Sequence, residues 1–484
     1  MNQDIEASPS PKKQISNVTV CSRFRPLNSK ERKDHGGQVC VRRIDDETFV
    51  FKDEKEEEST FSFDKVFYED SLQADVYEFI ALPIVRDVVN GVNGTIITYG
   101  QTGAGKTYSM EGPNVLESDD MKKGLLPRVV DGLFEHLASA GDSIKYEITL
   151  SMVEIYMEKV RDLFDLSKDN LVIKQNKGHE MLVSGVTEAS VSHVLILRLN
   201  LQAGIQNRAV GETQMNLASS RSHCAYIFTV LSDSTRDSRG RTGKLVLVDL
   251  AGSEKVEKTG AEGKLLEEAK TINKSLSALG NVINALTCSS SKSNHIPYRD
   301  SKLTRLLQDA LGGNSRTALI CCCSPSTSNS SETFSTLRFG TRAKHIKTSP
   351  TAKRIVDAET GARWNAVDVP TKVESVERIL AELSERLDDE DVNLLEELLL
   401  LERILFDPGT EEDLESGFED ISSPTFNLLQ QNLQKLMITC EELKSENKAL
   451  KARIAAGGTV EGGGEENGSF FMQKVSGIIS FFFP

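Results

Sequence analysis

The sequence predicts an α/β fold in which a central β-sheet is flanked by helices on both faces, followed by a helical, coiled-coil tail. Three observations lead to this prediction. Apolar, β-branched runs alternate with helical stretches between residues 17 and 347, a glycine-rich loop directly follows one of these runs, and leucines recur every seven residues near the carboxyl end. Residues 17–347 contain no clear internal linker, so we expect them to form one domain.

The apolar runs have the length and composition of buried strands. They read VTVCSRF, GTIITY, YEITLSMVEIY, AYIFTV, KLVLVDL and TALICCC. They alternate with helical stretches such as LQADVYEFIALPIVRDVV, which is the order of elements in an α/β domain. We therefore expect a largely buried central sheet with helices packed against it.

Segments of different composition lie on either side of this domain. The segment before it is polar and contains two prolines, and the segment directly after it is weakly periodic. The predicted segments are a disordered amino-terminal segment (1–16), a connector (348–372), an acidic helix (373–405), a linker (406–425), a coiled coil (426–454) and a glycine-rich linker with an apolar carboxyl end (455–484). The apolar end either binds a partner or a membrane surface, or is dispensable.

The coiled coil is predicted from leucines at seven-residue spacing, Leu429, Leu436, Leu443 and Leu450. Asn447 falls in the apolar seam between them, where the same residue of a second chain satisfies its side chain best. Residues 426–454 are therefore predicted to form a parallel homodimer. The alternative is a single amphipathic helix packed on the protein's own surface.

Charge is distributed unevenly along the chain. The net charge of −15 argues against a partner as acidic as nucleic acid, and we expect none. Of the 57 basic and 72 acidic residues, 12 and 27 lie from Arg354 onward, so residues 1–353 carry 45 of each. Residues 374–420 alone hold 18 acidic and 3 basic side chains. The amino-terminal domain is thus neutral, and local cations on it can still attract an acidic protein surface.

The eight cysteines form no CxxC pair or regular framework, and the amino-terminal residues lack the apolar core of a signal peptide. The apolar stretches are shorter than the roughly 20 residues that a membrane-spanning helix needs. We therefore expect reduced thiols, a cytosolic or nuclear location and no transmembrane segment.

Residues 100–107, GQTGAGKT, follow the predicted strand GTIITY and match the phosphate-binding pattern GxxxxGK[ST]. In such a loop the backbone N–H groups surround a polyphosphate, the lysine reaches the terminal phosphates and the last hydroxyl can bind Mg²⁺. The motif makes the predicted fold P-loop NTPase-type, and the alternative is an ordinary glycine-rich turn. The candidate nucleotide-binding residues are Gly100, Gln101, Thr102, Gly103, Ala104, Gly105, Lys106 and Thr107.

A second strand supports a nucleotide site. KLVLVDLAGSE is an apolar run with Asp249 at its end, where a carboxylate can hold the Mg²⁺ shell at the carboxyl edge of a sheet. Taken alone, this aspartate would be expected to cap a turn. Together, the two motifs predict a hydrolase that acts on a Mg-nucleotide.

Further strings identify the family. NLASSRSH (216–223) resembles the switch I signature of kinesin motors, and DLAGSE (249–254) resembles their switch II. HIPYRDSKLTR (295–305) resembles their microtubule-binding loop and helix, and RFRP, FSFDKVF and SETFSTLRF add matches in the family's order. The resemblance covers residues 17–347 and is greatest to the conventional, kinesin-1-like branch, which has an amino-terminal, plus-end-directed motor.

The resemblance implies which residues bind ATP and Mg²⁺. Arg23, Arg25 and Pro26 would flank the adenine, on which Tyr108 would stack. The metal shell would be completed by side chains of the phosphate-binding loop and of both switches. These are Thr107 and Ser220 as ligands and Asp249 through water.

The resemblance also implies how hydrolysis proceeds. Asn216, Ser219 and the backbone of Gly252 would contact the γ-phosphate. Arg221 and Glu254 would form a salt bridge that closes the pocket and orders the attacking water, with Glu254 accepting its proton through a water relay. The alternative for this pair is an ordinary surface ion pair.

On the filament side, the resemblance implies contacts between cationic residues and the acidic surface of tubulin. The matching positions are Lys255, Lys258, Tyr298, Arg299, Lys302 and Arg305. For Lys258 alone, a merely solvated charge is an equally good interpretation. Residues 264–286 resemble the relay helix, which would convert loss of the γ-phosphate into a tilt of the motor on its track.

The connector departs from the family's pattern. The family continues with a neck linker that pairs with the motor core as a β-strand and is held by an asparagine. Here Pro350 lacks an N–H donor for such pairing, and Lys353 occupies the position of the asparagine. The predicted coiled coil begins only at residue 426, after a long acidic tether, which would weaken communication between two motor domains.

We therefore expect a microtubule-stimulated ATPase that moves toward plus ends with weak processivity, in the cytoplasm and on the microtubule cytoskeleton. The sequence assigns no cargo. One alternative is a non-motile, ATP-dependent regulator of microtubule dynamics, which the lack of a basic stretch before Asn17 disfavours. Another is a binding module without hydrolysis, which the intact phosphate-binding and switch motifs disfavour.

Overall fold

The computed structural model describes residues 16–34, 36–115, 119–138, 144–176, 178, 180–191, 194–210, 221–234, 240–254, 264–288 and 295–355. The chain divides into two compact units, Met1–Glu188 with Leu201–Arg354 and Ala189–Asn200 with Ile355–Pro484. In the second unit the described residues form β12 (Ala189–Val191) and the first part of α6 (Val194–Val210). The elements discussed below belong to the first unit.

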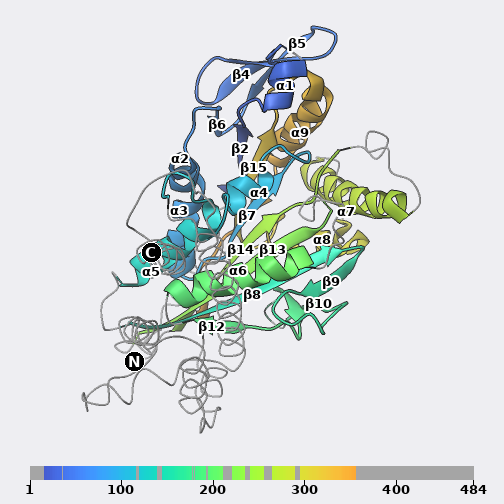
Figure 1. Cartoon of the computed structure of the whole chain (residues 1–484). Helices are drawn as coiled ribbons and strands as arrows, with labels where there is room; N and C mark the ends of the chain where they lie inside the picture. The colour runs from blue at the N-terminus through green and yellow to red at the C-terminus, as the bar shows by residue number, and fades with distance from the viewer. Residues whose placement is uncertain are drawn as a thin grey trace, which may run out of the picture. The chain divides into compact units, whose positions relative to one another are not determined.

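The central sheet of the first unit has the strand order β8-β13-β14-β7-β15-β2-β6 (Figure 1). The pairs from β14 to β6 are parallel, and β13 pairs antiparallel with both β8 and β14. The strands are β2 (Thr19–Phe24), β6 (Lys65–Phe67), β7 (Gly94–Tyr99), β8 (Ile144–Tyr156), β13 (His223–Ser234), β14 (Gly240–Asp249) and β15 (Arg316–Cys323). Each apolar run that we predicted to be a strand corresponds to one of them, so the predicted sheet is confirmed.

Helices cover both faces of this sheet, as predicted. Along β13, Tyr226 and Phe228 alternate with Ala225 and Ile227, and all four side chains are buried. Ala225 and Ile227 share a hydrophobic cluster with residues of α7, α8 and α9, while α3 packs against β7 and β14. The helices are α2 (Gln73–Val76), α3 (Leu82–Val89), α4 (Lys106–Met110), α5 (Leu125–Ala138), α7 (Lys264–Thr287), α8 (Lys302–Leu306) and α9 (Ser330–Ala343).

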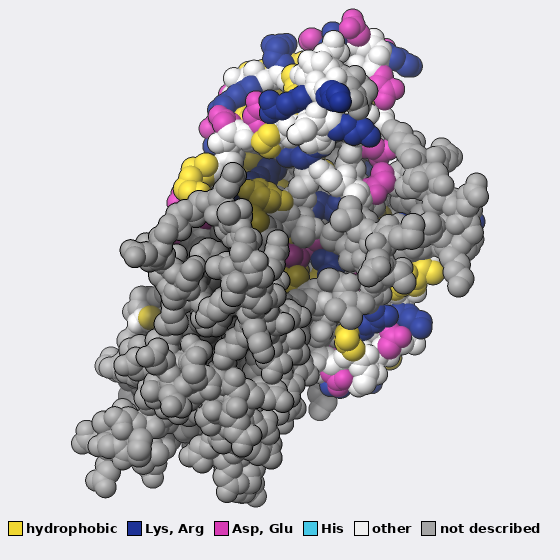
Figure 2. Space-filling model, viewed as in Figure 1, with side chains coloured by type: hydrophobic (Ala, Val, Ile, Leu, Met, Phe, Trp, Pro, Cys, Tyr) yellow, Lys and Arg dark blue, Asp and Glu magenta, His cyan; other side chains and the backbone are white. Residues whose placement is uncertain are grey.

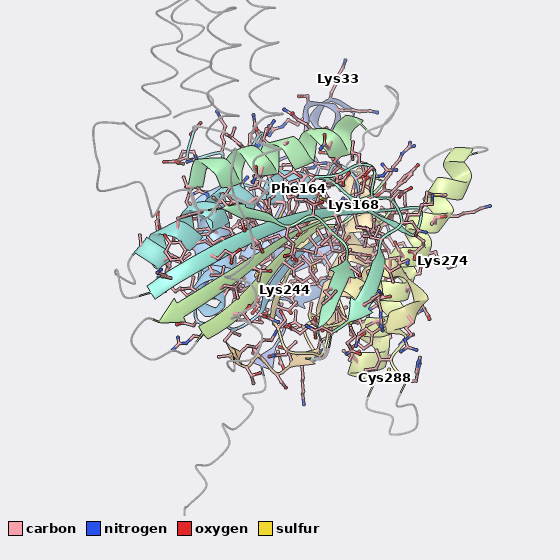
Figure 3. The ribbon with its side chains drawn as sticks, turned by 90° about the horizontal axis from the view of Figure 1, so that it is seen from below. Lys33, Phe164, Lys168, Lys244, Lys274 and Cys288 are labelled. Carbon is pink, nitrogen blue, oxygen red and sulfur yellow. The ribbon has the colours of Figure 1, made fainter. Side chains whose placement is uncertain are left out.

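Two predicted helices have the expected extent. A π-helical turn, Tyr77–Ala81, joins α2 to α3, so the stretch predicted over residues 72–89 is continuously helical. The predicted relay helix corresponds to α7. Figure 3 shows Lys274 on α7 pointing away from the sheet.

Smaller sheets surround the central one. β3 (Val41–Arg43), β4 (Thr48–Lys52) and β5 (Glu58–Ser62) form an antiparallel lobe beside α1 (Ser29–Asp34), and Lys and Arg side chains lie at its surface (Figure 2). The rings of Phe51 and Phe61 contact Phe334, which attaches this lobe to α9. β9 (Lys159–Asp162) pairs with β8, and β10 (Val172–Gln175) pairs with β11 (Met181–Ser184).

The first part of the predicted connector lies against the core. β16 (Lys347–Thr348) pairs with β1 (Ser16–Asn17), so Ser16, which we placed in the disordered amino-terminal segment, belongs to a paired strand. Beyond β16, backbone N–H groups of Ser349 and Lys353 donate to the carbonyls of Gly313 and Gly91, at 3.1 and 2.9 Å. The N–H of Thr351 donates to Asn314 Oδ1 at 2.6 Å.

This arrangement corrects our expectation about Pro350. We counted its missing N–H group against pairing of the connector, but the donors are residues 349, 351 and 353, which alternate with the proline. In an extended segment successive residues point in opposite directions, so the proline occupies a position from which no donor is required. Pro350 is therefore compatible with pairing of the connector.

Other predicted segments lie outside the described residues. These are most of segment 1–16, the remainder of the connector, and the acidic helix, linker, coiled coil and apolar end from residue 373 onward. Among the residues that the structure does describe, no helix is both long and apolar enough to cross a membrane.

Candidate active site

The phosphate-binding loop, residues 100–107, leaves the carboxyl end of β7 between two parallel neighbours, β14 and β15. This edge of a parallel sheet is where ligands bind in α/β folds. Gly100 has a φ of 147°, and a Cβ atom there would lie 2.1 Å from the carbonyl oxygen of Cys322, so only glycine fits. Within the loop, Lys106 Nζ donates to the carbonyl of Gln101 at 2.9 Å, and burial lowers the pKa of this lysine.

The residues predicted to hold Mg²⁺ meet in the structure where they are described. Asp249 ends β14 and is paired in register with Thr98 of β7, which brings its carboxylate beside the loop. The hydroxyl of Thr107 donates to Asp249 Oδ2 at 2.8 Å, and that of Thr98 donates to Oδ1 at 3.2 Å. A hydroxyl and a carboxylate are the oxygen ligands that Mg²⁺ prefers, so this pair fits the ion.

A buried charge network behind this pair was missed by the sequence reasoning. Arg208 of α6 is 4% exposed, and its guanidinium lies 3.3 Å from Asp249 and 3.5 Å from Glu111. Tyr226 donates to Glu111 at 2.5 Å. Burial raises the pKa of Glu111, and the charge of Arg208 opposes that rise. The network holds the carboxylate of Asp249 in one orientation, because both of its oxygens have partners.

Switch II is bonded directly to the phosphate-binding loop. The carboxylate of Glu254 accepts from the N–H of Thr102 at 2.8 Å and from its hydroxyl at 2.5 Å. A Cβ on Gly252 would lie 2.3 Å from the Thr102 hydroxyl oxygen, so a side chain there would displace the Thr102 and Glu254 side chains. The predicted salt bridge between Arg221 and Glu254 stays a prediction.

His223 connects switch II to α7. Its Nδ1 accepts from the N–H of Ala251 at 3.0 Å, and its Nε2 lies 2.8 Å from the hydroxyl of Ser275. The Ser275 hydroxyl in turn donates to the carbonyl of Ile272, so Nε2 carries the proton. Burial, together with the charges of Arg208 and Lys106, lowers the pKa of His223 to about 3. The imidazole is therefore neutral at physiological pH.

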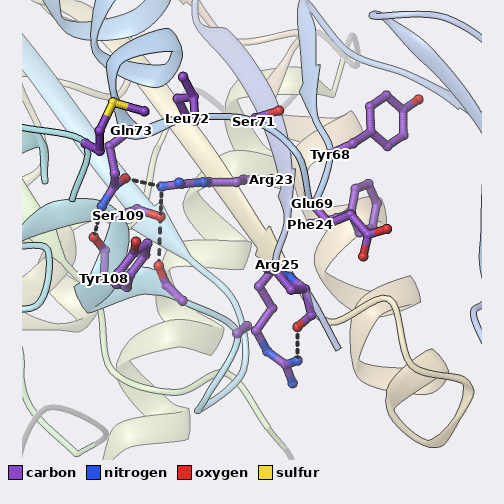
Figure 4. A pocket seen from close by; sticks show the side chains of 14 residues that line it. Arg23, Phe24, Arg25, Tyr68, Glu69, Ser71, Leu72, Gln73, Tyr108 and Ser109 are labelled. Atoms are coloured by element: carbon purple, nitrogen blue, oxygen red, sulfur yellow. Dashed lines mark hydrogen bonds between the residues drawn. The ribbon is translucent and has the colours of Figure 1, made fainter. Parts of the chain in front are cut away.

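A pocket beside the loop is lined by all four residues that we expected around the adenine (Figure 4). The guanidinium of Arg23 lies 5.7 Å from the centre of the ring of Tyr108, a residue that is 45% exposed. Arg23 Nη1 donates to Gln73 and Ser109, at 2.7 and 2.8 Å. Arg25 and Pro26 complete the predicted set. An exposed flat ring next to a positive group is a suitable surface for stacking a base.

Gln73 organises this pocket, although no sequence motif marked it. Its side-chain amide donates to the carbonyls of Tyr108 and Lys122, at 2.8 and 3.3 Å. Because both amide hydrogens are used in this way, its oxygen must point toward Arg23.

The filament-side residues are only partly described. Arg299 is exposed at the start of the segment before α8, whereas Tyr298 packs against the core and donates to the carbonyl of Leu311. Burial raises the pKa of Tyr298 to about 12. Lys302 and Arg305 lie on α8, where the N–H of Lys302 is held by Glu158 at 2.9 Å. The residues outside the described part of the chain are Asn216, Ser219, Ser220, Lys255 and Lys258.

Comparisons with known proteins give one consistent answer. A model of the kinesin motor domain matches residues 23–346. The chain is 62% identical over 439 residues to the kinesin-like protein KIN-1 of Arabidopsis thaliana, covering 90% of this chain and 94% of that protein. It is 60% identical over 418 residues to the KIN-1 of Oryza sativa subsp. japonica, with 86% and 87% covered. A solved structure of a fast kinesin is 44% identical, has a TM-score of 0.66, and covers 74% of this chain and 98% of that chain.

These matches confirm the resemblance drawn from the motifs and the fold drawn from the apolar runs. Kinesin motor domains bind nucleotide and hydrolyse ATP when stimulated by microtubules. With the family model covering the sheet, the phosphate-binding loop and both switches, this chain belongs to the kinesin family and is a microtubule motor ATPase that associates with the cytoskeleton.

Proposed function

We propose that this motor couples the hydrolysis of Mg-ATP to plus-end-directed movement, as a weakly processive homodimer in the cytoplasm. The main support is that hydrogen bonds join the phosphate-binding loop to switch II and join switch II to α7. Thr102 is bonded to Glu254 of switch II, and Ala251 of the same switch is bonded through His223 to Ser275. A change at the phosphates can therefore reach the helix that resembles the relay helix.

The residues of the site divide the work of hydrolysis. The loop backbone and Lys106 bind the phosphates, and Arg23, Arg25, Pro26 and Tyr108 bind the base. Thr107, Ser220 and Asp249 hold Mg²⁺, which neutralises phosphate charge when it is bound.

The switch residues act on the reacting phosphate. Asn216, Ser219 and the backbone of Gly252 bind it, while Arg221 pairs with Glu254 when the pocket closes. Glu254 then orders the attacking water and takes its proton through a relay. In the structure Glu254 lies against Thr102, which supports its position at the loop. Phosphoryl transfer depends mainly on such positioning and charge neutralisation.

The filament-binding face combines α8 with the segments around it. Arg299, Lys302 and Arg305 supply positive charge there, and Lys255 and Lys258 extend it. Tyr298 supports this face from inside, because its hydroxyl is bonded to the core. Such a cationic face suits acidic tubulin although the whole chain carries a charge of −15.

We infer weak processivity from the length of chain between the motor domain and the predicted coiled coil. The described connector ends at Ile355, and the predicted coiled coil begins at residue 426. Between them, residues 374–420 carry 18 acidic and 3 basic side chains, and a long acidic tether of this kind would weaken mechanical communication between two motor domains.

Single-molecule tracking of the full-length chain on microtubules tests the proposal. We expect short, ATP-dependent runs and two fluorophores per spot. Long unidirectional runs by single dimers would contradict weak processivity, and single-fluorophore spots would contradict the dimer. ATP turnover that ignores added microtubules would contradict the coupling itself.

A further inference from the structure

Glu31 of α1 is a buried carboxylate with an unusual number of partners. It is 5% exposed, and its two oxygens accept hydrogen bonds from four residues. Both terminal nitrogens of Arg25 donate to it, at 2.6 and 2.7 Å. The N–H of Asn28, the hydroxyl of Ser324 and the amide of Asn329 each donate at 2.9 Å.

Capping of a short helix explains only part of this arrangement. The N–H of Glu31 donates to Asn28 Oδ1 while the Glu31 carboxylate accepts from the N–H of Asn28, which is a capping box at the start of α1. The remaining donors come from elsewhere in the sequence, from the end of β2, from the segment after β15 and from the residue before α9. The carboxylate therefore joins segments that the helix alone does not need.

Two of these partners reach the phosphate-binding loop. Arg25, held from below by Glu31, donates from Nε to the carbonyl of Gly103 at 2.7 Å (Figure 4 shows Arg25 at the pocket). Asn329 accepts from the side-chain amide of Gln101 at 2.9 Å. Glu31, Arg25, the loop and Asn329 thus form a closed ring, in which the loop is held at Gln101 and at Gly103.

We propose that Glu31 is a positioning residue for nucleotide binding, which holds the backbone of the phosphate-binding loop in place through Arg25 on one side and Asn329 on the other. The proposal rests on the proposed function in that this loop is taken to bind ATP. Loops of this kind bind phosphate with their backbone N–H groups, so their affinity depends on a fixed backbone. Glu31 supplies a charge that fixes it from outside the pocket.

Charge, rather than shape alone, is required at this position. Every partner of Glu31 is a donor, and hydrogen bonds from Arg25 to a carboxylate are stronger than those to a neutral group. Burial would by itself raise the pKa of Glu31, but the hydrogen bonds from Arg25, Asn28 and Ser324 outweigh it and hold the pKa at about 2. In Glu31→Gln one carboxylate oxygen is replaced by an amide nitrogen. This nitrogen is a donor and cannot accept a hydrogen bond from the donors that surround it.

The test compares Glu31→Gln with the wild-type full-length chain. We expect the Kd for a fluorescent ATP analogue, measured without microtubules, to rise about tenfold, which is about 1.4 kcal/mol. The KM for ATP in the microtubule-stimulated ATPase should rise by a similar factor, while kcat stays within about twofold, because Glu31 touches no reacting atom. Glu31→Asp, which keeps the charge, should recover part of the affinity.

Asp87→Asn is the matched control. It removes the charge from another carboxylate–arginine pair, with Arg316 at 2.6 Å, at the opposite end of the strands. Its Kd and KM should equal those of the wild type. If Glu31→Gln does not fold, Asn329→Ala opens the same ring at a neutral residue and should raise the Kd about threefold.

The outcomes are distinguishable. Unchanged affinity in Glu31→Gln and Asn329→Ala would overturn the proposal, as would tighter binding, which would mean that Glu31 merely neutralises Arg25. If Glu31→Gln and Asp87→Asn raised the Kd equally, the proposal would also be overturned. Loss of any paired carboxylate would then have the same effect. If the wild-type chain binds no ATP, the proposed function itself fails.

Discussion

The phosphate-binding loop and the connector are attached to the same sheet in different ways. The loop is surrounded by buried charges, since Lys106, Asp249 and Arg208 are each at most 5% exposed. The connector is attached through backbone donors of alternating residues and one partly exposed ion pair, between Lys353 and Glu180. A buried charge whose partner is removed carries a large energetic penalty, whereas each contact of the connector is weak. The contacts of the loop are therefore more costly to break than those of the connector.

Breaking the buried network should have the largest effect. Arg208→Met removes the partner of Asp249 and Glu111 and leaves two carboxylates buried side by side. We expect a loss of about 3–5 kcal/mol in the free energy of unfolding, measured by denaturant titration. Arg316→Met, which breaks the more exposed pair with Asp87, should lose about 1 kcal/mol or less. Equal losses in the two variants would contradict the contrast between buried and exposed charges.

Removing the contact between switch II and the loop should act on chemistry rather than on stability. In Glu254→Ala the microtubule-stimulated kcat should fall about 100- to 1000-fold, because the water loses its positioning group. The Kd for ATP should change far less than kcat, since the phosphates keep Lys106 and the loop keeps its hydrogen bonds to Arg25 and Asn329. A parallel steady-state ATPase and nucleotide-binding measurement separates the two. A variant that hydrolyses ATP at half the wild-type rate would remove Glu254 from the mechanism.

Lowering the pH should weaken the ring that Glu31 forms with Arg25, the loop and Asn329, over a defined range of pH. The folded-state pKa of Glu31 is depressed to about 2 from 4.5, so its contribution is fully present above about pH 4.5 and is lost as the pH falls toward 2. This contribution is about 3 kcal/mol. The difference in unfolding free energy between the wild type and Glu31→Gln should therefore shrink across this window. A difference that is independent of pH would assign the effect to packing.

The connector should respond to small changes. Glu180→Gln removes the charge that faces Lys353, and both side chains are about a quarter exposed, at 25% and 22%. We expect a loss of about 1 kcal/mol in docking, seen as roughly fivefold faster hydrogen exchange at the N–H groups of Ser349, Thr351 and Lys353. Unchanged exchange would mean that the backbone donors alone hold the segment.

Substitutions at and next to Pro350 test whether alternate backbone N–H groups hold the connector. Pro350→Ala should leave the exchange of the neighbouring donors unchanged within about twofold, because residue 350 has no donor role. Thr351→Pro removes the donor to Asn314 and should release the segment. If Pro350→Ala instead slows exchange markedly, the proline weakens docking after all.

Apolar runs along the sequence predicted the helices and strands, and the spacing of glycine and lysine in residues 100–107 predicted the phosphate-binding loop. The meeting of Thr107 with Asp249 also followed from the sequence, because two strands that end at one sheet edge bring their last residues together. The sequence did not predict the network of Arg208, Glu111 and Tyr226. These residues are far apart in the sequence, and their side chains meet only in the folded core. Glu31 was hidden for the same reason, as its partners extend from residue 25 to residue 329.

The expectation about Pro350 failed for a different reason. It considered the missing donor but not the alternation of an extended segment, in which every second N–H group points away from the core. Whether odd- or even-numbered residues direct their N–H groups toward the core depends on where β16 pairs with β1. That register is set by tertiary structure.

We propose that the loop, switch II and α7 act together to turn ATP hydrolysis into directed movement. A surface gliding assay with polarity-marked microtubules tests it most directly, with Glu254→Ala as the matched variant. We predict that the wild-type protein moves microtubules with their minus ends leading, only with ATP, and that Glu254→Ala binds microtubules without moving them. Wild-type protein that hydrolyses ATP but leaves microtubules stationary, or Glu254→Ala that moves them at wild-type speed, would contradict the account.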